Sequence, residues 1–393
     1  MTAPHEHDGP AALAGLLRDR GLLGAPAWER VFLRVERHRF VPDVIWAVDA
    51  TRSDGQLVAV GRDDPYWWRT VHQDVAIATQ VDDGCPAGHG GRGRCVTSSA
   101  SQPSLMLAVL DVLDVADGMR VLEIGTGTGY NAALLAARLG ADRVVSVEVD
   151  PVLAAQARRR LEAAELTPTL VVGDGEHGVP EHAPYDRVLA TAAAADVPYA
   201  WVAQTRPGGL VVLPWGTPYS STGLLRLRVG ADGTASGRVV RRAGFMWLRR
   251  QRAPAGGWRC YVDPEAEADV SSTTVDPADL VPFDSPARFA VGVLVPGLCQ
   301  VVLPAADGSG RATLWLYDGG GAWASVDHVP GAYASVVAQH GRRRLWDEVE
   351  RAHRWWERAG RPHRERFGVT VAPDGQTVWL DAPDRPVPAP LAG

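Results

Sequence analysis

Apolar residues follow two kinds of pattern along the chain, and the pattern changes near residue 120. Residues 11–24 and 28–35 are rich in Leu, Val and aromatic side chains at helical spacing, which predicts two short helices near the N-terminus. From residue 120 to residue 214, short β-branched runs alternate with helical stretches. This alternation predicts an α/β fold with a doubly wound parallel sheet.

The centre of this region is a strand, a glycine-rich turn and a helix. Residues 120–124 are apolar and β-branched, as in a buried parallel strand, and residues 131–139 have a strong helix propensity. Gly125, Gly127 and Gly129 lie between them at alternate positions. Glycine lets the backbone come close to a ligand, and the start of the helix offers unpaired N–H groups. The stretch therefore predicts a ligand-binding crossover.

The glycine spacing and two acidic residues indicate which ligand. A dinucleotide site has the pattern G-x-G-x-x-G, whereas this chain has G-x-G-x-G. Glu123 precedes the turn, and Glu148 ends the next predicted strand, residues 143–148. A carboxylate at the tip of that strand can accept hydrogen bonds from both hydroxyls of a ribose. The arrangement resembles the S-adenosylmethionine (SAM) site of class I methyltransferases; a glycine-rich turn without a ligand is the alternative.

The alternation continues with a helix at 151–164 and strands at 170–172 and 185–190. Gly173 and Asp174 come directly after the first of these strands. A carboxylate at the end of a strand can meet the amino group of an adenine, or it can simply make a turn. Asp174 is therefore a candidate either for an adenine contact or for a turn residue.

The composition limits the classes of function. With 46% hydrophobic and 22% charged residues the chain can bury a real core, and a net charge of −6 argues against nucleic acid as the main partner. Its 40 cationic residues are all Arg, which excludes a Schiff-base lysine. The longest apolar run, residues 290–306, is broken by Pro and Gly, so we expect no transmembrane helix and no membrane partner.

The cysteines indicate the compartment. None of the four forms a C-x-x-C motif, so we expect no zinc or other metal site. Cys85 and Cys95 flank a glycine-rich loop and could close a disulfide. We favour free thiols in a cytoplasmic protein.

Short motifs that occur in one order along the chain identify a family. The motifs are Phe40–Pro42, Ser99–Pro103, Leu122–Tyr130, Gly173–Gly175, Pro184–Asp186, Thr191–Ala193, Arg206–Gly209 and Phe245–Arg249. Together they resemble the protein-L-isoaspartate O-methyltransferases, over about residues 28–252. The Ser-Gln-Pro element separates this family from other SAM-dependent enzymes, and the last motif resembles the family's last strand.

The resemblance implies roles for individual residues. Ser101 matches the family's active-site serine, which precedes a helix. The positions implied to contact SAM are Glu123, Gly125, Thr126, Gly127, Glu148, Gly173 and Asp174. Further candidates for contacts with the acceptor are Ser99, Gln102 and His72, the last from an aromatic stretch at 63–84. The glycine-rich insert at 82–94 departs from the family pattern, and it affects the shape of the acceptor pocket.

The last third of the chain predicts additional α+β structure. Residues 312–317 read as a strand, Pro373–Gly375 as a hairpin turn, and 343–358 as a helix. Residues 341–366 hold nine Arg against five acidic residues, which suits either a solvated amphipathic helix or a dock for an acidic peptide. This extension resembles that of isoaspartyl-methyltransferase-like enzymes found with peptide-tailoring clusters of the graspetide and lanthipeptide types.

These observations combine into three expected parts and one expected function. The parts are an N-terminal helical cap with a substrate-side loop (1–95), a SAM-binding core (96–255) and a peptide-recognising α+β extension (256–393). We expect methylation of an aspartate side chain in an acidic, ribosomally made and macrocyclic precursor peptide, leading to an aspartimide. The alternatives are repair of L-isoaspartyl residues and a non-catalytic SAM-binding scaffold. An acceptor carboxylate with a pKa near ~4 is ionised at neutral pH, so no strong general base is required.

Overall fold

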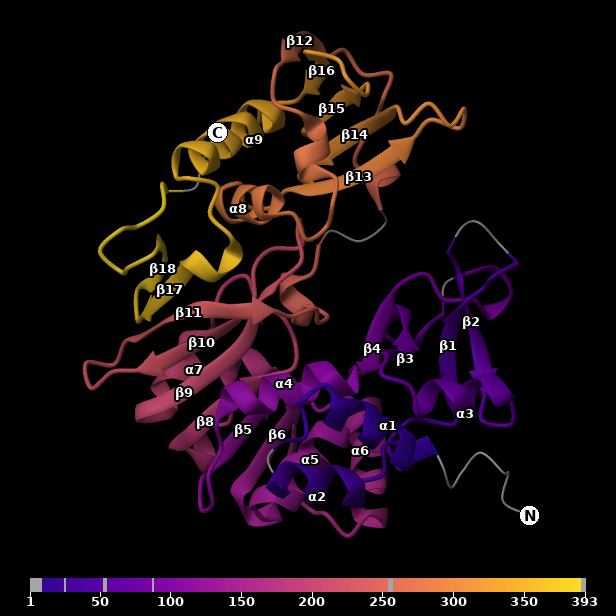
Figure 1. Ribbon diagram of the computed structural model, residues 1–393, viewed down its shortest axis with the longest axis vertical. Helices are drawn as coiled ribbons and strands as arrows, with labels where there is room; N and C mark the ends of the chain where they lie inside the picture. The colour runs from indigo at the N-terminus through magenta and orange to yellow at the C-terminus, as the bar shows by residue number, and fades with distance from the viewer. Residues whose placement is uncertain (1–8, 25, 52–54, 87, 254–256, 390–393) are drawn as a thin grey trace. The chain divides into compact units, whose positions relative to one another are not determined.

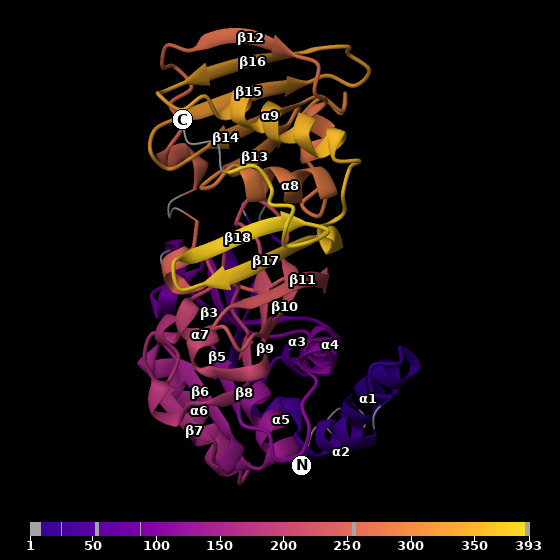
Figure 2. The same ribbon diagram turned by 90° about the vertical axis from the view of Figure 1, so that its left-hand side faces the viewer.

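The computed structural model describes residues 9–24, 26–51, 55–86, 88–253 and 257–389, and Figures 1 and 2 show their helices and strands. The chain forms two compact units. Unit 1 consists of Met1–Ala192, Pro198–Val212 and Arg228–Gly233; unit 2 consists of Ala193–Val197, Leu213–Leu227 and Thr234–Gly393. The functional division predicted at residues 95 and 255 stays a prediction, because compact units reflect packing and not function.

Unit 1 is built on a parallel sheet whose strands alternate with helices. The strands are β5 (Val121–Ile124), β6 (Val144–Glu148), β7 (Thr169–Val172), β8 (Tyr185–Ala190) and β9 (Thr205–Trp215), the last of which ends in unit 2. Their order is β7-β6-β5-β8-β9, and each neighbouring pair in this order is parallel. Every side chain of β5, β6 and β8 is buried, as expected for a sheet covered on both faces. The predicted doubly wound α/β fold is confirmed.

The helices of this core come from the segments between its strands. They are α4 (Pro103–Leu113), α5 (Tyr130–Leu139), α6 (Pro151–Ala163) and α7 (Tyr199–Ala203). Both α5 and α6 pack on β6. Because the strands are parallel, their carboxyl ends lie at one edge of the sheet. The glycine-rich turn after β5, the last residue of β6 and the turn after β7 are therefore brought to the same edge.

The N-terminal part of unit 1 contains the two predicted helices and a sheet that the sequence pattern does not predict. The helices are α1 (Gly9–Asp19) and α2 (Pro26–Arg34), followed later by α3 (Pro65–Val71). The strands are β1 (Val44–Val48), β2 (Leu57–Gly61), β3 (Ile77–Val81) and β4 (Val96–Ala100), in the antiparallel order β2-β1-β3-β4. These strands have five residues each and irregular burial, so no two-residue period is visible in the sequence.

Unit 2 has the expected α+β character. Its strands are β10 (Gly223–Val229, which ends in unit 1), β11 (Ala235–Arg242), β12 (Asp269–Thr273), β13 (Cys299–Pro304), β14 (Ala312–Tyr317), β15 (Trp323–His328), β16 (Ser335–His340), β17 (Phe367–Ala372) and β18 (Gly375–Leu380). Five of them form an antiparallel sheet in the order β12-β16-β15-β14-β13, and β10, β11, β17 and β18 are successive neighbours in another sheet. The hairpin predicted at Pro373–Gly375 joins β17 to β18.

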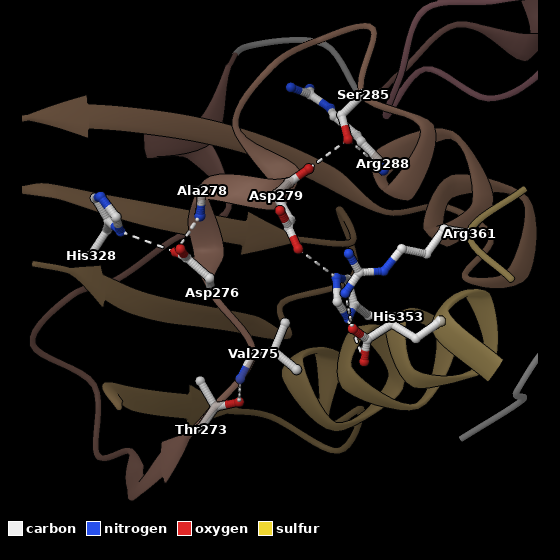
Figure 3. Close-up of polar contacts among 11 residues, drawn as sticks. Thr273, Val275, Asp276, Ala278, Asp279, Ser285, Arg288, His328, His353 and Arg361 are labelled. Carbon is white, nitrogen blue, oxygen red and sulfur yellow. Dashed lines mark hydrogen bonds and ion pairs between the residues drawn. The ribbon is translucent and has the colours of Figure 1, made fainter. Parts of the chain in front are cut away.

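Two helices, α8 (Pro286–Leu294) and α9 (Leu345–Arg358), pack against each other in unit 2. The short 3-10 turn η9 (Pro277–Leu280) carries polar contacts to two other elements, as Figure 3 shows. Asp279 Oδ2 lies 3.1 Å from Nε2 of His353 on α9, and Asp276 Oδ1 lies 3.4 Å from Nδ1 of His328 on β15. These contacts tie the turn to both the helix and the sheet.

The strand predicted at Phe245–Arg249 does not form. Trp247 makes only an isolated parallel bridge with Ala193, and the side chains of residues 245–247 are half-buried. A single bridge leaves the neighbouring peptide groups without a continuous ladder, so the segment stays irregular.

Candidate active site

The three glycines after β5 all have a left-handed backbone, with φ of 94° at Gly125, 53° at Gly127 and 86° at Gly129. A Cβ on the first would lie 2.9 Å from Thr191 Oγ1, and one on the third would lie 3.3 Å from the Cβ of Ala157 on α6. The first and third glycines are therefore required by packing as well as by backbone conformation.

Gly127 faces a different part of unit 1. A Cβ there would lie 3.8 Å from both Ser98 Oγ and the Ser99 carbonyl oxygen, which belong to β4. The glycine-rich turn is thus next to the strand that leads to Ser101. The sequence places these two stretches 26 positions apart, counting from Ser101 to Gly127, and the fold brings them together.

Glu148, the predicted distal acid, is bound to the middle of the glycine-rich turn. Its Oε2 accepts the backbone N–H of Gly127 at 2.8 Å, and its Oε1 accepts that of Asp150 at 3.0 Å. The residue is buried. Each carboxylate oxygen keeps a lone pair beyond these bonds. The position therefore fits a group that presents two hydroxyls at the end of β6, as a ribose does.

Glu123 lies beneath the turn, completely buried. Its carboxyl accepts hydrogen bonds from Asn131 Nδ2 at 2.6 Å and from Ser146 Oγ at 2.5 Å. Burial raises the pKa of Glu123 to about 7, although these two hydrogen bonds oppose the rise. Thr126 Oγ1 lies 2.6 Å from the same Ser146 hydroxyl. Both predicted residues thus support the turn from inside, and their direct contact with a cofactor stays a prediction.

Gly173 and Asp174 follow β7 at the same edge of the sheet. Asp174 Oδ1 accepts the backbone N–H of Glu176 at 3.0 Å, so one carboxylate oxygen makes the turn that the sequence suggested. The next residue, Gly175, packs on Ile124 of β5, and its carbonyl accepts Trp201 Nε1–H at 2.8 Å. These contacts fix the turn beside the glycine-rich segment, and a contact of Asp174 with adenine stays a prediction.

Ser101 follows β4 and is held through its backbone by Arg37. Arg37 Nη2 donates to the carbonyl oxygens of Ala100 at 3.2 Å and of Ser101 at 3.0 Å. The same guanidinium donates to three more carbonyl oxygens, those of Val71, Gln73 and Val75. Burial lowers the pKa of Arg37 to about 10, so its charge is kept at neutral pH.

Sequence analysis missed Arg37. The residue stands in the charged run Glu36–Arg39, where a buried arginine has no distinguishing signal. Its five carbonyl partners come from segments that are 34 to 64 positions away.

The start of α4 is capped by a side chain from another segment. Gln102 occupies the N-cap position of α4 but its side chain makes no capping bond. Asp74 supplies the acceptor: its Oδ1 takes the Ser104 backbone N–H at 2.8 Å, and its Oδ2 takes Gln102 Nε2–H at 3.2 Å. Burial opposes the shift, but the hydrogen bonds from Ser104 and Gln102 hold the pKa of Asp74 below its usual value.

The remaining acceptor candidates lie in two places. Ser99 is on β4, paired with Ala78 of β3, and is partly exposed. The His72 ring lies against Gly9 of α1 and makes an edge contact with the ring of His38, 5.8 Å between centroids. Ser99 thus lies on the strand that leads to Ser101, whereas His72 is part of an aromatic cluster. Contacts of Ser99, Gln102 and His72 with an acceptor stay predictions.

The glycine-rich insert is organised by Asp82. Its carboxylate accepts the backbone N–H groups of Arg94 and Cys95, at 3.0 Å and 2.8 Å, which closes the loop at its base.

All four cysteines are free thiols. Within the described ranges, no three His, Cys, Asp or Glu side chains are grouped so that they could hold a metal ion. Among the helices of the same ranges, none is long and apolar enough to span a bilayer.

Comparison with known proteins identifies relatives of this chain. Residues 89–252 match the family described as protein-L-isoaspartate(D-aspartate) O-methyltransferase (PCMT). The chain is 38% identical over 168 residues to protein-L-isoaspartate O-methyltransferase 2 of Polaromonas sp. strain JS666, which is 42% of this chain and 75% of the relative. It is 42% identical over 182 residues to the protein-L-isoaspartate O-methyltransferase of Anaeromyxobacter dehalogenans, 46% of this chain and 83% of the relative.

A solved structure titled protein-L-isoaspartate O-methyltransferase shares the fold, with a TM-score of 0.52 and 23% sequence identity. The match covers 95% of this chain and 100% of the other. The chain belongs to the protein-L-isoaspartate O-methyltransferase family of SAM-dependent protein carboxyl O-methyltransferases.

Proposed function

We propose that this protein methylates the free carboxylate of an L-isoaspartyl residue in peptides and proteins, the residue named in its relatives. One observation carries the proposal: β4, which leads to Ser101, lies 3.8 Å from the position of a Cβ on Gly127. A cofactor at the glycine-rich turn and an acceptor at Ser101 would then be neighbours. Proximity of this kind supplies much of the rate of a two-substrate reaction.

The residues fit the cofactor. The space beside Gly127 is open to 3.8 Å, Glu148 has lone pairs for a ribose diol, and Asp174 follows β7, the neighbour of β6. When bound, SAM supplies a methyl group made transferable by its positively charged sulfur. These residues hold and orient; none of them needs to exchange a proton.

The acceptor side needs positioning more than acid–base chemistry. A carboxylate with a pKa of about 4 is ionised at neutral pH and is already a nucleophile. In the proposal, the Ser101 hydroxyl donates a hydrogen bond to one acceptor oxygen and leaves the other directed at the methyl group. Arg37 holds the Ser101 backbone in place through its hydrogen bond to the Ser101 carbonyl oxygen. The new bond joins the carboxylate oxygen to the methyl carbon, and the product is a methyl ester.

The ester then reacts without further help from the chain. The backbone nitrogen of the following residue attacks the ester carbonyl, loses its proton and expels methanol. The product is a succinimide (aspartimide). Water opens this ring to aspartyl or isoaspartyl peptide, so repeated cycles convert isoaspartate to aspartate.

A second candidate acceptor is an aspartate in a ribosomally made, macrocyclic precursor peptide, with the aspartimide as the product. The resemblance of the C-terminal region to peptide-tailoring relatives favours it. The helix expected to bind an acidic peptide is less cationic than its arginine count suggests, because Arg354 and Arg361 of this region pair with Glu350 and Glu357 at 2.5 Å and 2.8 Å. Arg343 pairs with Glu348 at 2.7 Å. We therefore rank this acceptor second.

Mass spectrometry separates the candidates. The protein is incubated with SAM and one of three peptides: an isoaspartyl peptide, its aspartyl counterpart, or a macrocyclic aspartyl peptide. We expect a gain of one methyl group, or the succinimide derived from it, on the isoaspartyl peptide alone. Modification of the macrocycle alone would replace the first candidate by the second. SAM binding by calorimetry without methyl transfer to any peptide would indicate a scaffold.

A further inference from the structure

Unit 1 has a surface pocket away from the glycine-rich turn, where β1 and β3 meet α6. Its volume is about 560 Å³. The charged residues of its lining are Arg39, Asp43, Arg159 and Arg160, and Trp46 belongs to its apolar lining. The combination of guanidinium groups and an indole ring suits an anion carried on an apolar stem.

The charges of the pocket do not cancel within it. Arg39 pairs with Glu36 at 2.8 Å, and Asp43 pairs with Arg62 at 3.4 Å. Among the described residues, Arg159 and Arg160 have no carboxylate within ion-pair distance.

Arg160 is partly desolvated. Its Nη2 donates to Gln156 Oε1 at 3.4 Å, and burial lowers the pKa of Arg160 below its usual value. The charge of Asp43 acts on Arg160 in the opposite direction, but Asp43 is itself paired with Arg62. The lining therefore keeps an excess of positive charge for an anion from outside, and a guanidinium partly removed from water binds a carboxylate more strongly than a fully hydrated one.

A chain of contacts connects the pocket to the candidate active site. Thr79 lines the pocket, and its hydroxyl lies 3.3 Å from Ser98 Oγ on β4. Ser98 Oγ is also the atom that a Cβ on Gly127 would meet at 3.8 Å. Ser101 follows three positions later, about 10 Å along an extended chain. An extended peptide advances about 3.3–3.6 Å per residue, so roughly three residues reach from Ser101 to the Ser98 side of the pocket, and Arg159 and Arg160 on α6 require a longer span.

We propose that this pocket binds an acidic side chain of the polypeptide substrate, roughly three to six residues from the acceptor carboxylate. The inference rests on the proposed function for the position of the acceptor. A Glu or Asp side chain would place its carboxylate between Arg159 and Arg160 and its methylene groups against Trp46. The pocket would then select acceptor sites in acidic sequence contexts.

Peptide binding, measured without turnover, tests the inference. Fluorescence anisotropy is recorded with the full chain and labelled isoaspartyl peptides that carry Glu at one position, roughly three to six residues before or after the isoaspartate. A matched peptide carries Gln at all of these positions. We expect at least one Glu peptide to bind about three- to tenfold more tightly than the Gln peptide, a preference that falls as salt is raised.

Two matched variants locate the effect. R159Q/R160Q should reduce the preference for Glu to about onefold and leave binding of the Gln peptide unchanged. R30Q/R34Q removes the same charge from exposed positions on α2 and should keep the preference. Equal affinities of wild type for Glu and Gln peptides, or an undiminished preference in R159Q/R160Q, would overturn the inference.

Two further experiments, phosphate binding and methyl transfer, distinguish the possible outcomes. Calorimetry with inorganic phosphate tests the pocket as a site for free anions: phosphate binding lost in R159Q/R160Q, with equal binding of all peptides, would overturn the peptide assignment. Methyl transfer is measured on the same peptides. If they are bound with the Glu preference but not methylated, the proposed acceptor is wrong and the pocket stands. If they are methylated without the preference, the pocket is wrong and the proposed function stands.

Discussion

The guanidinium of Arg37 donates a hydrogen bond to the backbone carbonyl of Ser101 at 3.0 Å, across 64 positions of sequence. The contact fixes the residue that follows β4 to the turn after α3, because the same side chain also binds three carbonyl oxygens there. Five acceptors on one buried side chain make it a positioning element for the acceptor side of the site. Lysine, with three donors on a single nitrogen, cannot serve them all.

Arg37→Lys should therefore lower both stability and turnover. Unsatisfied buried carbonyl groups should reduce the free energy of unfolding by roughly 3 kcal/mol, measured by urea denaturation. In the fraction that is folded, kcat should fall about tenfold or more while the Kd for SAM stays within about twofold. Arg34→Lys, on the exposed face of α2, is the control. A folded Arg37→Lys protein with wild-type kcat would show that the side chain is structural only.

The pKa of Glu123 predicts a pH dependence of stability with an unusual sign. Its value in the folded protein is about 7, against an ordinary value of 4.5, mainly because the group is buried. The folded state therefore binds this proton more tightly than the unfolded state does. The contribution is complete below about pH 4.5 and is lost as the pH rises to about 7, a loss of up to roughly 3 kcal/mol.

Glu123→Gln isolates this contribution. The amide can accept from Asn131 and donate to Ser146, so the network is kept without a titrating group. The free energy of unfolding of wild type minus that of the variant should decrease between about pH 5 and about pH 8. The measurement is urea denaturation across that range. A difference that is constant or increases with pH would contradict the raised pKa.

Some of this site could be predicted from the sequence because its signals are local. Gly125, Gly127 and Glu148 stand at the ends of adjacent parallel strands, so their spacing alone brings them to one edge. The N-cap of α4 shows the limit of local signals. Ser104 has a residue type common at N-caps, but Gln102 occupies that position, and the acceptor of the Ser104 N–H is Asp74, 30 positions away. The sheet β1–β4, which places Ser101 beside the glycines, depends on pairings between short strands with no regular period.

The first two glycines should respond differently to Ala. At Gly125 the new Cβ would collide with Thr191 Oγ1, whose hydroxyl donates to the Gly125 carbonyl oxygen at 2.6 Å. We expect Gly125→Ala to reduce the free energy of unfolding by about 2–3 kcal/mol, from the collision and the positive φ together. At Gly127 the Cβ meets only ordinary contacts, so the fold should lose about 1 kcal/mol.

The effect on SAM binding should have the opposite order, with Gly127→Ala weakening it more than Gly125→Ala does. A Cβ on Gly127 would occupy the space toward β4, so Gly127→Ala should raise the Kd for SAM by tenfold or more, measured by calorimetry on protein that is shown to be folded. Gly127→Ala protein that binds SAM like wild type would place the cofactor elsewhere.

Glu148→Gln should weaken SAM binding more than stability. An amide can accept from Gly127 or from Asp150 but presents an N–H to the other donor, and it loses the charge that strengthens bonds to a diol. We expect the Kd for SAM to rise about 10- to 100-fold, with a loss of about 1–2 kcal/mol in the free energy of unfolding. Glu162→Gln, at an exposed position of α6, should change neither quantity. An unchanged Kd in Glu148→Gln would remove the ribose contact from the proposal.

Ser101→Ala separates the hydroxyl from the backbone that Arg37 holds. Because Arg37 donates to the Ser101 carbonyl oxygen, which Ala keeps, the free energy of unfolding should stay within about 0.5 kcal/mol of wild type. The Kd for SAM should stay within about twofold, since the glycine-rich turn is untouched.

Methyl transfer to an isoaspartyl peptide should fall about 10- to 100-fold in kcat/KM, the size expected when one hydrogen bond to a charged group is lost. Ser101→Thr, which restores a hydroxyl, should recover part of the loss. If Ser101→Ala transfers methyl groups at the wild-type rate, the acceptor is oriented by another donor, and Ser99, partly exposed on the strand that leads to Ser101, is the side chain to test next.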